Sequence, residues 1–254
     1  MNSPPQTAGA QSPLQDALAL HRQGKHELAM QGYVAILQQN PGNIDALYYV
    51  AVLALQQGQI ADGIRVIERA LALGSAQARF YNLLGQAHLR VNQDSEALES
   101  FGRAIETDPT FVDAYGNRAA LLAEMGKLDD ALTDFDHALR LRPSNAEDWC
   151  NRAGVLADLG RLEEALDGFD RALTLMPVLA PAYFNRAGVL MRLGRSREAL
   201  RDYDESIKLH EAMASAHVGR ARALEALGRS ADAKVSLDRA AALDPKLAKG
   251  VASN

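Results

Sequence analysis

The sequence predicts an all-α protein, a right-handed α-solenoid built from seven helix-turn-helix repeats of 34 residues each. Three observations support this prediction. Glycines recur at spacings of 34 or 68 residues, small residues form two further rows with the same period, and prolines close most of the repeats. A fixed period of this length is typical of repeat proteins, in which each repeat buries its apolar face against its neighbours.

The turn inside each repeat is marked by a residue suited to a left-handed backbone. This row consists of Gly24, Gly58, Asn92, Gly126, Gly160, Gly194 and Gly228. Glycine has no Cβ, and asparagine is the other residue that tolerates this conformation well. We therefore expect seven helices to end at these positions.

Small residues recur in both helices of each repeat. The row in the first helix is Ala17, Ala51, Gly85, Ala119, Ala153, Ala187 and Ala221. The row in the second helix is Ala29, Gly63, Ala97, Ala131, Ala165, Ala199 and Ala233. Small residues at a helix contact allow a short interaxial distance, so the two rows predict tight antiparallel hairpins. Larger residues are expected to fill the core at Tyr33, Ile67, Phe101, Phe135, Phe169, Tyr203 and Leu237.

The fifth repeat resembles the tetratricopeptide signature almost throughout. The matching residues are Trp149, Ala153, Leu156, Ala165, Phe169, Ala172 and Pro177, whereas Arg152 stands where the family usually has leucine. In this register the repeats are 10–43, 44–77, 78–111, 112–145, 146–179, 180–213 and 214–247, with a disordered leader at 1–9 and a tail at 248–254. The first repeat departs most from the signature, because Pro13 stands where an aromatic residue is expected and Asp16 where an apolar residue is expected. Such changes are expected of an end cap that faces solvent on one side.

Composition limits the partners and the compartment. The net charge is -5, so no positive field attracts nucleic acid, and no stretch is apolar enough for insertion into a membrane. Cys150 is the only cysteine, and the N-terminus has no signal-peptide pattern, so we expect a cytoplasmic protein.

The sequence gives no sign of catalysis. The seven repeats leave nine residues before them and seven after, too few for a catalytic domain. The six histidines occur at no metal-ligand spacing, and no phosphate-binding loop or nucleophile motif is present. We therefore expect no enzyme activity, no catalytic or metal-binding residue and no cofactor.

The family resemblance implies that the first helix of each repeat lines a concave groove. Asn117, Asn151 and Asn185 occupy the sixth position of repeats four to six, and Asn82 occupies the fifth position of repeat three. An amide both donates and accepts hydrogen bonds, so such a row could hold the main chain of an extended peptide. This row resembles the asparagine ladder of O-linked N-acetylglucosamine transferases. The alternative is that these asparagines only stack helices or solvate a polar face.

The two ends of the same face carry different candidate residues. Tyr48 and Tyr49 belong to an N-terminal apolar stretch with Leu14, Leu18, Val52, Leu55, Leu83 and Leu89, which is either an exposed interface or part of the core. Phe184, Arg192 and Arg222 suggest a basic, partly apolar place for an acidic peptide. Self-association through the apolar stretch or through the last hairpin is a further expectation.

Arginine and aspartate occur together in the later repeats. Repeats four to seven have Arg118, Arg152, Arg186 and Arg220 at the seventh position and Asp136, Asp170, Asp204 and Asp238 at the twenty-fifth. The first three repeats have neither. We expect Arg–Asp pairs that bridge helices within or between hairpins and fix their geometry.

The predicted function is a scaffold that holds a protein or peptide segment in its groove, because a repeat array offers an extended surface and no reactive centre. The alternative is a detached or truncated substrate-recruiting arm of a glycosyltransferase, since the repeats resemble those of bacterial proteins of that type. The basic residues with which chaperone-tail adaptors bind a carboxylate are missing, so that partner is not expected.

Overall fold

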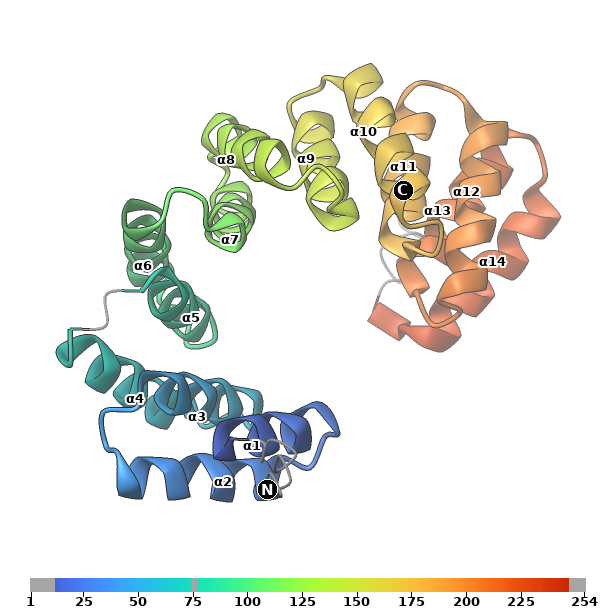
Figure 1. The fold of residues 1–254 in the computed structure, drawn as a ribbon. Helices are drawn as coiled ribbons and strands as arrows, with labels where there is room; N and C mark the ends of the chain where they lie inside the picture. Colours follow the sequence, from blue (N-terminus) through green and yellow to red (C-terminus); the bar gives the residue numbers. More distant parts are fainter. Residues whose placement is uncertain (1–11, 75–76, 247–254) are drawn as a thin grey trace, which may run out of the picture. The chain divides into compact units, whose positions relative to one another are not determined.

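The computed structural model describes residues 12–74 and 77–246, and the predicted leader (1–9) and tail (248–254) lie outside them. The described residues form fourteen α-helices (Figure 1). They are α1 (Pro13–Arg22), α2 (His26–Gln39), α3 (Ile44–Gln56), α4 (Ile60–Ala72), α5 (Ala78–Leu89), α6 (Asp94–Thr107), α7 (Val112–Glu124), α8 (Leu128–Leu141), α9 (Ala146–Asp158), α10 (Leu162–Leu175), α11 (Ala180–Arg192), α12 (Ser196–Leu209), α13 (Ala214–Ala226) and α14 (Ser230–Leu243). The prediction of seven paired-helix repeats forming an all-α solenoid is confirmed.

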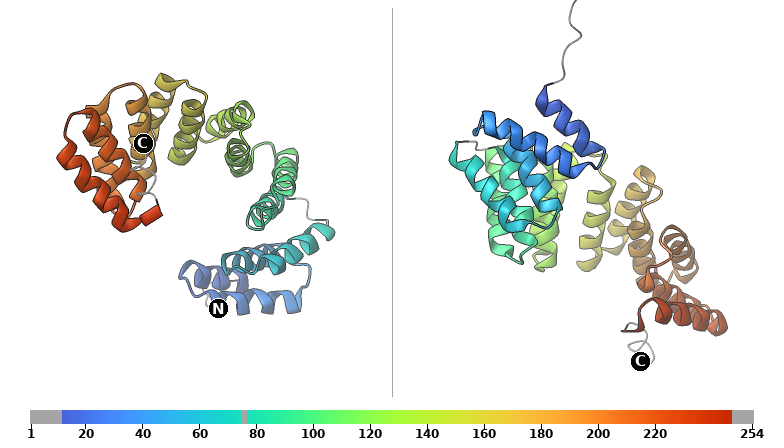
Figure 2. Two further views of the ribbon diagram at one scale, coloured as in Figure 1. Left: turned by 180° about the vertical axis from the view of Figure 1, so that it is seen from behind. Right: turned by 90° about the horizontal axis from the view of Figure 1, so that it is seen from below.

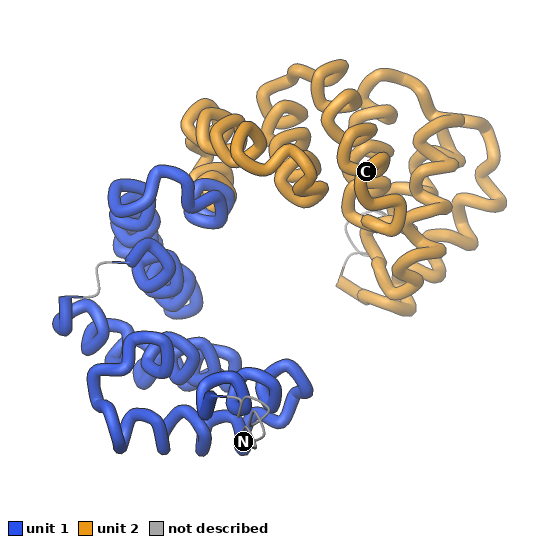
Figure 3. Tube along the Cα trace, in the orientation of Figure 1, with its two compact units in different colours: residues 1–118 blue, residues 119–254 orange. Residues whose placement is uncertain are grey.

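The chain divides into two compact units, Met1–Arg118 and Ala119–Asn254, and the boundary falls within α7 (Figure 3). In unit 1, α1 packs on α2, α3 on α4 and α5 on α6. In unit 2, α9 packs on α10, α11 on α12 and α13 on α14. The helices of each pair run antiparallel, as two further views show (Figure 2). Each pair also contacts the next pair in its unit, so hairpins stack in sequence order.

The turns inside the hairpins are left-handed, as predicted. The six glycines have φ between 73° and 79°. Asn92, at 57°, is the one non-glycine residue with positive φ among the described residues. After each such turn the chain bonds back to the preceding helix, as from the Lys25 amide to the Leu20 carbonyl at 3.0 Å. This closure satisfies carbonyl groups that the end of the helix would leave unpaired.

The rows of small residues lie at the helix contacts. Every alanine of both rows is at most 1% exposed. At Gly85 a Cβ atom would lie only 2.5 Å from the ring of Phe101, so this glycine is required by packing. The predicted large core residues are buried as well, except that Leu237 is only partly buried because it lies in α14, on the last described hairpin.

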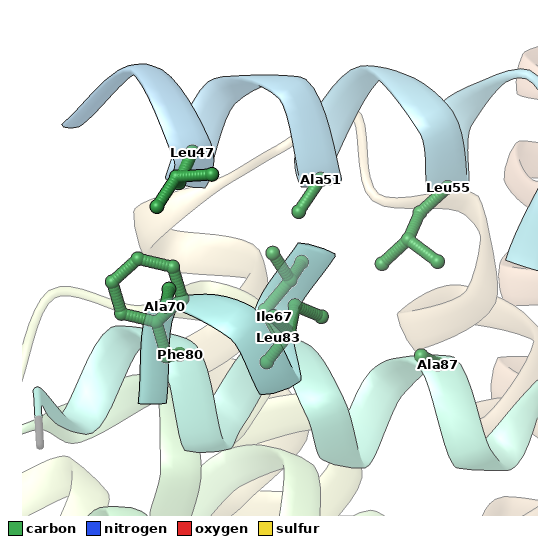
Figure 4. Packing of buried hydrophobic residues seen from close by; sticks show 8 residues of the cluster. All are labelled: Leu47, Ala51, Leu55, Ile67, Ala70, Phe80, Leu83 and Ala87. Atoms are coloured by element: carbon green, nitrogen blue, oxygen red, sulfur yellow. The ribbon is translucent and has the colours of Figure 1, made fainter. Parts of the chain in front are cut away.

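The N-terminal apolar stretch lies largely inside the fold. Leu55 and Leu83 are 4% and 7% exposed and belong to one core cluster with Ile67 and Phe80 (Figure 4). The other members are half-buried, and none is among the exposed large apolar residues. These side chains fill the space between the hairpins of unit 1, which favours the alternative that the stretch is part of the core. Association through its half-buried members stays a prediction.

The last described hairpin presents a mixed surface. Val235 is 67% exposed on α14, but Lys234, Asp238 and Arg239 around it are charged and exposed. Self-association through this hairpin remains a prediction.

The arginine–aspartate pairs form between neighbouring repeats. Arg152 bonds Asp136 and Arg220 bonds Asp204, both at 2.6 Å, and each aspartate belongs to the preceding repeat. The predicted bridges are thus confirmed between hairpins. Within its own repeat, Arg220 bonds the residue at position 23 and not the aspartate at position 25. It donates to the Ser236 hydroxyl at 2.7 Å.

Arg186 joins both kinds of partner. It bonds Asp170 of the preceding repeat at 2.5 Å and reaches Asp202 of its own repeat with two bonds of 2.7 Å. The Asp202 side chain is only 9% exposed. The hydrogen bonds to Asp202, more than the pair with Asp170, raise the pKa of Arg186 above its ordinary value. This arginine therefore ties α11 to α12 and to the preceding hairpin.

Candidate functional site

Two asparagines of the predicted row lie exposed in unit 2. Asn151 is in α9 and Asn185 is in α11, one repeat apart. The side-chain amide of Asn151 has no hydrogen-bond partner among the described residues. The Asn185 side chain lies within hydrogen-bonding reach of the Cys150 thiol of the preceding repeat. These two amides keep most of their bonding capacity for solvent or for another molecule.

The other two asparagines, in unit 1, bond each other. The Asn117 amide nitrogen donates to the Asn82 carbonyl oxygen at 2.9 Å, and Asn82 is only 7% exposed. This bond uses the Asn82 acceptor and links α5 to α7. The predicted row is therefore not uniform, because one pair closes on itself while Asn151 stays free.

Two glycines lie one helical turn beyond the exposed asparagines. A Cβ atom built on Gly154 or on Gly188 would meet nothing within 4 Å. At Gly168, by contrast, a Cβ would lie 2.9 Å from the Cβ of Ala153. Glycine inside a helix costs about 0.5–1 kcal/mol relative to alanine. Close packing therefore accounts for the glycine at position 168. It does not account for the glycines at 154 and 188, where the described residues leave room for a larger side chain.

A group of aromatic and basic residues spans the sixth and seventh repeats, in α11, α12 and α13 of unit 2. Phe184 is half-buried and its ring centroid is 6.0 Å from that of Tyr203. Tyr203 lies over Gly219, where a Cβ would lie 2.4 Å from its ring. Burial raises the pKa of Tyr203, and the charge of Arg222 partly offsets this rise. Arg222 is exposed. These residues therefore place an aromatic surface beside an accessible cation.

Arg192 has a structural partner. It donates to the carbonyl oxygen of Ala157 at 2.6 Å, near the end of α9. Arg90 makes the equivalent bond to the Leu55 carbonyl in unit 1. A cation near the last carbonyls of a helix is stabilised by the helix dipole. Arg192 thus joins neighbouring repeats, and its charge is only partly available to a ligand.

Tyr48 and Tyr49 are half-buried among other rings. Tyr49 stacks on Tyr33 with centroids 5.5 Å apart. Arg79 covers Tyr48, with its guanidinium carbon 4.7 Å from the ring centroid, and also pairs with Asp45 at 2.6 Å. Most of the aromatic surface of both tyrosines is therefore used inside unit 1.

Cys150 is expected to react slowly with thiol reagents. Its side chain is 4% exposed, and burial raises its pKa from 9.0 to about 11, although the Asn185 hydrogen bond opposes the rise. A rise of this size lowers the thiolate fraction at pH 8 by about a hundredfold. Reaction with Ellman's reagent at pH 8 should therefore be at least that much slower in the native protein than in guanidinium. Equal rates in both conditions would contradict the burial of this thiol.

The part of the chain that is described shows neither a cluster of metal ligands nor a membrane-spanning helix. Residues 12–74 and 77–246 contain no group of three or more histidine, cysteine, aspartate or glutamate side chains placed to hold a metal ion. None of the described helices combines the length and the apolar character needed to span a bilayer.

Comparison with protein families identifies the repeats. Models of the tetratricopeptide repeat match residues 20–87, 78–111, 112–145 and 184–248. These ranges make up most of the chain, so the protein belongs to the tetratricopeptide repeat family. Such repeats are generally protein-binding scaffolds and are usually non-catalytic. No curated protein matches the sequence.

Solved structures share the fold. PilF of Pseudomonas aeruginosa has a TM-score of 0.72 and 18% identity, over 80% of this chain and 92% of its own. A tetratricopeptide repeat protein of Parabacteroides merdae has a TM-score of 0.69 and 17% identity, over 94% and 95%. YrrB, described as having an unusual peptide-binding site, has a TM-score of 0.59 and 22% identity, over 74% and 98%. Nothing in these comparisons points to a glycosyltransferase, so that resemblance stays a prediction.

Several residues of interest were not found by sequence reasoning. Asp202 and Ser236 both occupy position 23 of their repeats and are buried, at 7% and 2% exposed. The sequence could have indicated them, because each is a polar residue in a repeat that also has arginine at position 7. Gly154 and Gly188, by contrast, were visible in the sequence as small residues of the first helices, and the structure adds that a Cβ at either would meet nothing within 4 Å.

Proposed function

We propose that this protein is a scaffold that holds an extended peptide segment of a partner against the first helices of its repeats, in unit 2. One observation carries the proposal. Gly154 and Gly188 expose bare helix backbone one repeat apart, and Asn151 and Asn185 precede them by three residues. Residues three apart lie on the same face of a helix. Each helix therefore presents an amide beside a place where another chain can approach closely.

The chemistry of this face suits the main chain of a peptide. An extended peptide has alternating N–H and C=O groups, and an asparagine amide can pair with both. Bare helix backbone lets the peptide lie close enough for such bonds. Because main-chain groups are the same in every peptide, this contact gives affinity without strong sequence preference. Phe184 precedes Asn185 in α11, and Arg222 lies in α13 of the next repeat. These two residues would add a preference for apolar and acidic side chains.

The glycines provide a test in which stability and binding should change in opposite directions. In the Gly154→Ala, Gly188→Ala double variant the free energy of unfolding should rise by about 0.5–1 kcal/mol per site, because alanine favours the helix. Affinity for a bound peptide should fall by about tenfold or more, because two methyl groups occupy its place. The peptide is first selected from a random displayed library on the native protein. Calorimetric titration and urea unfolding then measure both quantities.

Gly102 offers a matched control. It lies inside α6, a second helix of its repeat, and a Cβ there would make one ordinary contact, 3.9 Å from Arg118. The Gly102→Ala variant should be more stable and should bind the peptide unchanged. The Asn151→Ala, Asn185→Ala variant should bind the selected peptide more weakly and should keep its fold. If the glycine and asparagine variants all bound the selected peptide as the native protein does, this face would not be the binding site.

A further inference from the structure

A separate pocket lies between α8 and α9 in unit 2. It has a volume of about 500 Å³. Its lining residues are Thr133, Asp136, His137, Leu139 and Arg140 from α8, with Trp149 and Arg152 from α9. Trp149 and Arg152 occupy positions 4 and 7 of their repeat, and these differ from the positions of Asn151 and Gly154. The pocket is therefore distinct from the proposed peptide-binding face.

The apolar part of the pocket is an indole held in place by its own backbone. The Trp149 ring nitrogen donates to the Pro143 carbonyl at 2.9 Å, so the polar group of the side chain is satisfied within the chain. The side chain remains half-buried and lines the pocket with Leu139. A fixed aromatic surface that the chain leaves open is suited to contact with an apolar or aromatic group.

The charges of the pocket leave one arginine in excess. Asp136 is neutralised by Arg152 at 2.6 Å, and Arg152 also lies 5.9 Å from the Trp149 ring. Arg140 has no carboxylate partner in residues 12–74 and 77–246. Its guanidinium donates to Nδ1 of His137 at 2.7 Å, which leaves its other N–H groups unused. An exposed arginine with free donors, beside an apolar surface, favours a carboxylate.

The openness of the pocket favours a side chain over an enclosed small molecule. Thr133, Asp136 and Arg140 are exposed, so a ligand would keep one side in solvent. Small-molecule sites usually bury most of their ligand. A volume of about 500 Å³ accommodates neighbouring side chains of a docked segment.

We propose that this pocket is a second binding site, which takes an acidic residue adjacent to an aromatic residue in a partner protein. The aromatic ring packs on Trp149, and the carboxylate bonds Arg140. Neighbouring repeats do not reproduce this chemistry, because Tyr183 and Thr174 stand at the places of Trp149 and Arg140 in the next interface. The site therefore gives a sequence preference that main-chain contacts cannot supply.

Trp149 is the only tryptophan in the chain, so its fluorescence reports on this pocket without a label. The probe is the blocked peptide Gly-Ser-Asp-Phe-Ser-Gly, compared with peptides that have Asn for Asp or Ala for Phe. The Asp-Phe peptide should change the emission in a saturable way, and either replacement should weaken binding by about tenfold. No saturable change, or equal affinity for the three peptides, would overturn the proposal.

Two matched variants separate this pocket from general charge effects. Arg140→Gln should weaken binding of the Asp-Phe peptide by about tenfold and remove its advantage over the Asn-Phe peptide. Arg171→Gln removes the same charge from an exposed arginine of α10 outside the pocket, and affinity should stay within about twofold. Equal losses in the two variants would overturn the assignment. Loss of the signal in the Asn151→Ala, Asn185→Ala variant would instead place the peptide on the other face.

Discussion

Replacement of Phe169 by alanine is expected to lower the free energy of unfolding by about 3–5 kcal/mol. Phe169 is 0% exposed in α10 and lies in the row of large core residues. Its removal loses the transfer free energy of the ring and leaves a cavity that the neighbouring backbones cannot close. Gly168 already brings α10 within contact distance of Ala153 in α9, so the hairpin has little room to collapse further.

The measurement is urea unfolding followed by Trp149 fluorescence, because Trp149 lies in α9, the helix that pairs with α10. Leu175 is the control on the same helix, since it is 43% exposed. Leu175→Ala should change stability by less than about 1 kcal/mol. A loss below about 1 kcal/mol for Phe169→Ala would show that the core of this hairpin is not packed as described.

The second large effect is expected for Arg186→Met. This change removes both bonds to Asp202 and leaves a carboxylate, 9% exposed, without its cation. Breaking a buried ion pair on one side is strongly destabilising, so we expect a loss of about 3 kcal/mol at neutral pH. Arg152→Met is the matched control, because Arg152 has a partner, Asp136, that is 49% exposed. That variant should lose less than about 1 kcal/mol.

A double-mutant cycle tests the cause of this loss. In Arg186→Met, Asp202→Leu no buried charge remains, and much of the lost stability should return. The coupling free energy between the two sites should therefore be about 1 kcal/mol or more. Additive effects within about 0.3 kcal/mol would mean that Arg186 acts through packing of its stem and not through Asp202.

Much of the fold could be predicted from the periodic residues. The left-handed turns, the buried alanines and the large core residues follow from local geometry that repeats every 34 residues, so each was visible in the sequence. The candidate site was predicted less well. Asn151 and Asn185 lie exposed as expected, but Asn82 and Asn117 bond each other, and Arg192 bonds a backbone carbonyl.

The repeat length, the number of hairpins and the residues that pack between them all follow from the order of residues, because helix geometry and the absence of a Cβ act over a few neighbouring residues. Which side chains find a partner and which stay free depends on how the helices pack. Arg186 pairs with Asp202, whereas Gly154 and Gly188 have open space above them. Such differences depend on distances between helices, and the order of residues along the chain does not contain them.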